Sequence, residues 1–127
     1  TWDYVLIDGF DRNARAGVLD TEPFNQAVRA RLSARGIMAV NLFGRSRGYR
    51  TSLERIVRAY DDRAIAFPSC DSGNVVAFGA DGEPIARTVD ELRERARVLK
   101  SETGLDLGPT VSRLEQSGNL PGGQLLL

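Results

Sequence analysis

The sequence predicts an α/β domain with parallel strands and a terminal antiparallel hairpin. Two short apolar runs, residues 4–7 and 37–43, are typical of strands buried on both faces of a parallel sheet. Helical patterns alternate with these runs, which indicates parallel strands joined by helical crossovers. A second pair of runs, residues 64–70 and 74–80, flanks the turn residues Asp71-Ser72-Gly73 and therefore predicts a hairpin.

The first strand should end at Asp8, and a polar loop follows it from residue 10 to residue 19. The first helix should begin near Asp20 or Thr21, because both are good N-cap residues. Gly36 is a natural stop for this helix. The apolar face of the predicted helix consists of Phe24, Ala27, Val28 and Leu32.

A second helix is expected over residues 49–60, ending at Asp61-Asp62. Thr88 and Glu91 form a capping box that predicts the start of a third helix. The inner face of the second helix should carry Leu53, Ile56, Val57 and Tyr60, and that of the third Val89, Leu92, Ala96 and Leu99.

The patterns that indicate helices and strands become weaker from residue 105 onward. Residues 109–116 predict one short helix, and residues 119–127 read as a frayed end. We therefore expect two parts, an α/β half-domain over residues 1–104 and a C-terminal helix and tail over residues 105–127.

Composition limits the possible chemistry. The chain has 127 residues and 42% apolar residues, which suit one domain with its own core. It contains no histidine, which excludes Ser-His-Asp and Cys-His catalysis. The single cysteine, Cys70, excludes an internal disulfide and is expected to be a small buried residue rather than a nucleophile. Carboxylates, tyrosines and Lys100 remain as acid/base groups.

The environment expected for the chain is the cytoplasm, since there is no signal peptide and no apolar run of membrane-spanning length. The chain opens directly on a strand, so we expect a fragment of a longer protein. An unpaired edge on this strand predicts a homo-oligomer.

Positive charge is concentrated between Arg12 and Arg58, where ten arginines face three acidic residues, a local balance of +7 in a chain of zero net charge. A solvated helix face with basic loops is the favoured interpretation. Arg45, Arg47 and Arg50 with Tyr49 form a short basic patch of the kind that contacts nucleic acid. Because the whole chain is not basic, we expect no nucleic-acid partner.

The strongest candidates for chemistry are Asp8 and Asp11. Ligands of open α/β sheets bind outside the carboxyl ends of the strands, which selects this loop and residues 41–47. Gly9 allows a tight turn, so both carboxylates can face one cleft. Such a pair suits a cationic substrate or a general base, and mutual repulsion would raise one pKa. Alternatively, Asp8 caps a loop or helix and Asp11 is solvated.

Other ligand signals are missing from the sequence. A third metal ligand is not evident beside the two aspartates, so no metal is expected. The motif G-x-G-x-x-G follows no strand, so no cofactor-binding residue can be assigned.

Several motifs together resemble the spermidine synthase (polyamine aminopropyltransferase) family. Trp-Asp-Tyr-Val-Leu-Ile-Asp-Gly-Phe-Asp, residues 2–11, is similar to the family's fourth strand and its Asp-x-x-Asp loop. Residues 21–24 resemble its next helix start and residues 34–38 the entry to its fifth strand. Residues 72–79 resemble its Ser-Gly turn and long apolar strand. The match covers about residues 2–82.

The resemblance implies the C-terminal half of a Rossmann-like, S-adenosylmethionine-dependent methyltransferase fold. It implies that Asp8 is the catalytic aspartate and that Asp11, with Gly9 and Phe10, binds a diamine such as putrescine. Residues 9–19 would form a gate over the site. Decarboxylated S-adenosylmethionine would be the co-substrate of the full-length enzyme, held by the other half, and this fragment alone would bind none.

Three departures from the family pattern leave the amine acceptor open. Arg12 stands where the family has Pro, residues 41–43 (Asn-Leu-Phe) replace a Gln-Glu pair, and residues 69–71 (Ser-Cys-Asp) replace an acceptor-site Tyr. Two alternatives therefore remain, a methyltransferase-like enzyme on the same fold and a non-catalytic binding domain.

Overall fold

The computed structural model describes residues 1–13 and 15–127, which form two compact units. Residues 1–83, with Leu127, form the first unit, and residues 84–126 form the second. The first unit contains β1 (Trp2–Ile7), η1 (Gly17–Asp20), α1 (Glu22–Arg29), β2 (Leu32–Phe43), α2 (Tyr49–Ala59), β3 (Ala64–Ala66) and β4 (Asn74–Ala80). The second contains β5 (Ala86–Thr88), α3 (Val89–Thr103), α4 (Gly108–Gln116), η2 (Pro121–Gly123) and β6 (Gln124–Leu126).

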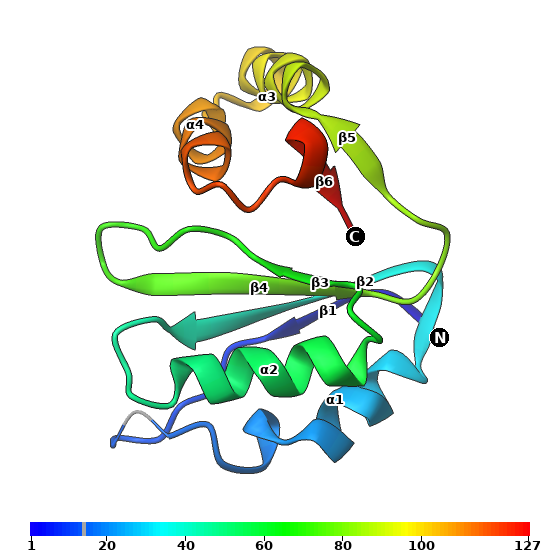
Figure 1. Ribbon diagram of the computed structural model, residues 1–127, viewed down its shortest axis with the longest axis vertical. Helices are drawn as coiled ribbons and strands as arrows, with labels where there is room; N and C mark the ends of the chain where they lie inside the picture. Colours follow the sequence, from blue (N-terminus) through cyan, green and yellow to red (C-terminus); the bar gives the residue numbers. More distant parts are fainter. Residues whose placement is uncertain (14) are drawn as a thin grey trace. The chain divides into compact units, whose positions relative to one another are not determined.

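The first unit is built on a four-stranded sheet with the order β1-β2-β4-β3. β1 runs parallel to β2, whereas β4 is antiparallel to both β2 and β3. Helices α1 and α2 lie along one face of this sheet (Figure 1). The mixed α/β architecture, with a parallel pair and a terminal hairpin, is therefore confirmed.

The core lies between the sheet and these two helices. Alternate residues of each strand face it, because side chains of a strand alternate between the two faces. From β1 these are Val5 and Ile7. Gly79 on β4 allows a close approach, since a Cβ there would lie 2.9 Å from the ring of Tyr60, which is fully buried. The buried apolar cluster consists of Ile7, Leu32, Met38, Val40, Leu42, Ile56, Ala59, Tyr60, Val75 and Ala77.

The first helix is shorter than the sequence predicts. It has the expected N-cap, because the Thr21 side chain accepts a hydrogen bond from the Phe24 backbone, but it ends at Arg29. Leu32, predicted for its apolar face, is instead the first residue of β2. Gly36 is not a helix stop: it lies within β2, where a Cβ would come 2.8 Å from the Trp2 carbonyl oxygen. Strand pairing with β1 therefore extends into a segment that reads as helical.

Two further boundaries differ from expectation. β3 is limited to three residues, although residues 64–70 read as a strand. The predicted frayed end contains β6, which pairs with β5 in an antiparallel two-stranded sheet. The third helix belongs to the same compact unit as this sheet, which begins at Pro84.

The remaining helices match the predictions closely. α2 ends just before Asp61 and Asp62, whose φ angles of 50° and 65° lie in the left-handed region and interrupt the helix. The capping box of Thr88 and Glu91 is formed at the start of α3. None of the helices among the described residues is long and apolar enough to cross a membrane.

β1 is an edge strand with an exposed apolar face. Trp2, Tyr4 and Leu6 are 63%, 73% and 79% exposed, and they alternate with the core-facing residues. An unpaired apolar edge can add a strand from another chain. We therefore expect the chain to self-associate through β1.

Leu6→Lys should shift the mass measured by light scattering toward the monomer value of 13.9 kDa, because a charge on the edge opposes pairing. Val18→Lys is a matched control, since Val18 is 71% exposed but lies in η1. A monomer at high concentration for the unsubstituted chain would contradict this prediction.

Candidate functional site

The pairing of β1 with β2 brings Asp8 beside Asn41. Ile7 pairs with Val40 in parallel register, so Asp8 and Asn41, which follow them, lie side by side at the carboxyl ends of the two strands. The Asn41 amide nitrogen donates a hydrogen bond of 3.1 Å to Oδ1 of Asp8. The Asp8 side chain is exposed. The predicted catalytic carboxylate therefore stands at the carboxyl end of a parallel strand, with a neutral amide as its neighbour.

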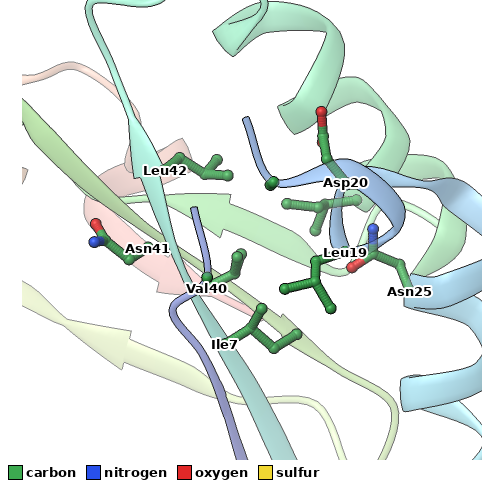
Figure 2. Close-up of a pocket in the computed structure, with 10 residues that line it drawn as sticks. Ile7, Leu19, Asp20, Asn25, Val40, Asn41 and Leu42 are labelled. Atoms are coloured by element: carbon green, nitrogen blue, oxygen red, sulfur yellow. The ribbon is translucent and has the colours of Figure 1, made fainter. Parts of the chain in front are cut away.

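The Asn41 side chain lies on the face of β2 away from the core. Val40 and Leu42, its neighbours in the chain, are buried in the core, whereas Asn41 is half-buried. Figure 2 shows its amide directed to the opposite side of the strand from Val40 and Leu42. Asp8 and Asn41 therefore meet on the outer face of the sheet.

Asp11 is held by its own loop. Its Oδ1 accepts hydrogen bonds from the backbone N–H groups of Asn13 (2.7 Å) and Arg15 (2.9 Å). The Asp11 backbone N–H donates to the Arg15 carbonyl at 2.9 Å. These bonds close the turn that follows β1, as the short side chain of Asp commonly does. Oδ1 of Asp11 therefore stabilises the loop through these hydrogen bonds.

The electrostatics of Asp11 differ from the expectation of mutual repulsion. The hydrogen bond from the Arg15 backbone, followed by that from Asn13, lowers the pKa of Asp11 from its ordinary value of 3.8. The increase that repulsion between the two aspartates would cause is not found at Asp11. This side chain stays ionised at neutral pH.

Gly9 and Phe10 occupy distinct surroundings. A Cβ on Gly9 would lie 2.5 Å from a methyl group of Leu19, so a larger residue there would displace the Leu19 side chain. Gly9 lines a small pocket of about 10 Å³ (Figure 2). Phe10 lines a larger hollow of about 360 Å³, together with Phe43 and Tyr49.

The described walls of these two pockets include neither Asp8 nor Asp11. Ala14, within the predicted gate of residues 9–19, lies outside the described residues.

A polar network that the sequence analysis missed stands in the wall of the larger hollow. Oδ2 of Asp20 accepts hydrogen bonds from the Ser52 hydroxyl and from the Arg55 guanidinium, both at 2.9 Å. Arg55 also donates to the Asp20 carbonyl. Asp20 was predicted as a possible N-cap, yet Thr21 takes that role. The network ties η1 to α2, and only long-range packing reveals it.

Cys70 is exposed, which corrects its prediction as a small buried residue. It lies in the turn between β3 and β4, where its sulfur is 2.8 Å from the Ser72 hydroxyl. The hydrogen bond with Ser72 lowers the pKa of the thiol. The turn lies beside the carboxyl end of β2, because the Gly44 backbone N–H donates a hydrogen bond to the Gly73 carbonyl.

Within residues 1–13 and 15–127, no group of three or more Cys, Asp or Glu side chains is arranged to hold a metal ion.

Sequence comparisons identify three relatives, all named polyamine aminopropyltransferase. One, from Chromobacterium violaceum, is 31% identical over 125 residues, which are 98% of this chain and 48% of the relative. This confirms the resemblance to the spermidine synthase (polyamine aminopropyltransferase) family. Two more, from Neisseria meningitidis serogroups A and B, are each 30% identical over 115 residues, covering 91% of this chain and 44% of the relative.

The chain spans about half the length of the polyamine aminopropyltransferases that it matches. No family model and no solved structure matches the chain.

The lowered pKa of Asp11 predicts how its loop responds to acid. The ionised side chain stabilises the fold above pH 3.8, and this contribution is lost as the pH falls through the lower folded-state pKa. Asp11→Ala should therefore decrease the melting temperature slightly at pH 7. The difference from the unsubstituted chain should shrink below about pH 3.8.

Asp71→Ala, which removes the same charge from another exposed loop, controls for net charge. Melting curves followed by circular dichroism between pH 2 and pH 7 make the measurement. A difference that stays constant over this range would contradict the prediction.

Proposed function

We propose that this protein takes part in transfer of an aminopropyl group from decarboxylated S-adenosylmethionine to a diamine such as putrescine. The observation that carries the proposal is the position of Asp8. In a relative of the polyamine aminopropyltransferases, an exposed carboxylate stands at the carboxyl end of a parallel strand, where α/β sheets bind ligands. Its Oδ1 is engaged by Asn41, and among the described residues no hydrogen bond engages Oδ2, which would therefore meet a substrate amine.

Asp8 would act on the attacking amine. A diamine is cationic near neutral pH, whereas attack on carbon requires a neutral nitrogen with a free electron pair. A carboxylate beside the ammonium group binds the cation and accepts its proton. The nitrogen then forms a bond to the aminopropyl carbon, and the bond from that carbon to the sulfonium sulfur breaks with release of a neutral thioether. Alignment of the two reactants in one site would supply much of the rate.

Asp11 would hold the diamine without accepting a proton. Its lowered pKa keeps it negative, and the loop hydrogen bonds from Asn13 and Arg15 engage Oδ1. A negative charge three residues after Asp8 suits the second ammonium group of a diamine. Phe10, which is 39% exposed between the two aspartates in sequence, offers an aromatic surface to the same cation. Gly9 permits the tight packing of this loop against Leu19.

This chain would supply the acceptor side of the active site. It contains no glycine-rich G-x-G-x-x-G loop, so residues outside this sequence would bind the co-substrate. The parallel β1–β2 pair, the crossover helix α1 and the antiparallel β4 are compatible with part of a Rossmann-like methyltransferase fold. We further propose a cytoplasmic homo-oligomer.

One observation favours a different function, that of a non-catalytic binding domain. Asp11 is bound by its own backbone, as expected for a carboxylate whose purpose is to shape a loop. In that case the surface near Asp8 would not respond to a diamine. A titration with putrescine therefore separates the two functions.

Putrescine should perturb the backbone amide signals of Asp8, Gly9 and Asp11 in nitrogen-15 NMR spectra of the chain. Asp8→Asn should weaken this binding by about tenfold, since one charged hydrogen bond is lost. Asp62→Asn is the matched control, because Asp62 is exposed, precedes β3 at the opposite edge of the sheet, and has a positive φ that Asn tolerates. Equal affinities for Asp8→Asn and the unsubstituted chain would remove Asp8 from the site.

The 127-residue chain alone should show no aminopropyl transfer, because it lacks a glycine-rich loop. Within a full-length protein of this family that carries the chain, Asp8→Asn should lower turnover by about 10²–10⁴-fold while the melting temperature is retained. Chromatographic detection of spermidine measures both. Turnover by the chain alone, or unchanged turnover of the full-length variant, would refute the respective statement.

A further inference from the structure

The geometry points to Asn41 as the residue that positions Asp8 for the amine, an inference that rests on the proposed function. Its amide nitrogen lies 3.1 Å from Oδ1 of Asp8. A hydrogen bond to one oxygen restricts rotation of the carboxylate and leaves the other oxygen directed away from the donor. Asn41 would thus set the direction in which Asp8 meets its substrate.

The backbone around Asn41 is fixed on both sides. β2 is an inner strand, paired with β1 through Val40 and with β4 through the Asn41–Val76 pair. The side chains that flank Asn41 on its own strand are buried in the core. The amide therefore extends from a rigid strand, whereas Asp8 begins a loop. A donor on a strand that is paired on both sides is the arrangement that orients a group on a neighbouring loop.

An amide is unexpected at this position on packing grounds. The outer face around it is apolar: Val76 lies opposite on β4, and Phe43 and Ala39 lie two residues away along β2. A half-buried amide in such surroundings loses part of its hydration, and a hydrogen bond to a neighbouring side chain offsets that loss. Asp8 is the partner that the structure provides. The hydrogen bond to Asp8, rather than packing within the sheet, therefore accounts for an amide at position 41.

A neutral donor suits a carboxylate that has to bind a cation. An arginine at this position would pair with Asp8 and compete with the substrate ammonium group for the same charge. An amide donates a hydrogen bond without cancelling that charge. Its own carbonyl oxygen is a hydrogen-bond acceptor, which offers the substrate nitrogen a second contact beside Oδ2 of Asp8.

The test compares Asn41→Leu with Asn41→Gln and with Ala39→Leu in the 127-residue chain. Asn41→Leu removes the amide at similar volume. Asn41→Gln restores an amide, and Ala39→Leu adds an apolar side chain to the same face of the same strand. Circular dichroism melting verifies that each variant is folded. Two quantities are measured, the putrescine dissociation constant from nitrogen-15 shifts and the carbon-13 signal of the Asp8 carboxyl group.

Asn41→Leu should weaken putrescine binding by about tenfold and move the Asp8 carboxyl signal. Asn41→Gln should recover most of the affinity, and Ala39→Leu should stay within about twofold of the unsubstituted chain. Unchanged affinity in Asn41→Leu, with the unsubstituted chain binding putrescine, would overturn the role of Asn41 alone. No response of the unsubstituted chain to putrescine at Asp8 would overturn the proposed function together with this inference.

Discussion

The parallel register of β1 and β2 is the constraint on which the candidate site depends. It pairs Ile7 with Val40, and both side chains are buried on the helix side of the sheet. Because side chains alternate along a strand, a slip of one residue would turn Ile7 out of the core and separate Asp8 from Asn41. The free energy gained by burying Ile7 and Val40 therefore also fixes the partner of Asp8. Packing on the helix side of the sheet therefore determines which side chain lies beside Asp8 at the end of β1.

The helix layer in turn fixes the register. Met38, Val40 and Leu42 are each 7% exposed or less, so β2 has little freedom to shift. The tight contact of Gly79 with Tyr60 brings α2 close to β4, the other neighbour of β2. The strand that carries Asn41 is thus held from both edges and from one face. Only the outer face of the first unit's sheet, which carries Asn41 and the exposed Tyr4 and Leu6, is free of α1 and α2.

The sequence predicts the elements whose pattern fits one structure only. A continuous apolar run identified β1, a run interrupted by Asn41 identified the end of β2, and capping residues identified the starts of α1 and α3. Leu32 fits both the helical spacing after Val28 and the first position of a strand, and tertiary pairing with β1 decided for the strand. The exposure of Cys70 and the pairing of β6 also depend on distant segments, so local patterns did not reveal them.

Asp8 and Asp11 have different surroundings in the structure, whereas the sequence pattern predicts that they act as a pair. A dyad that shares one proton needs two carboxylates with similar access to the same site. Here one carboxylate is tied to backbone N–H groups that keep it ionised, and the other is tied through one oxygen to a neutral amide. Under the proposed function, Asp11 would therefore be a permanent countercharge, and the exposed Asp8 at the end of β1 would exchange the proton. A substrate with two cationic groups of different fate, one retained and one that must lose a proton before it reacts, matches this asymmetry.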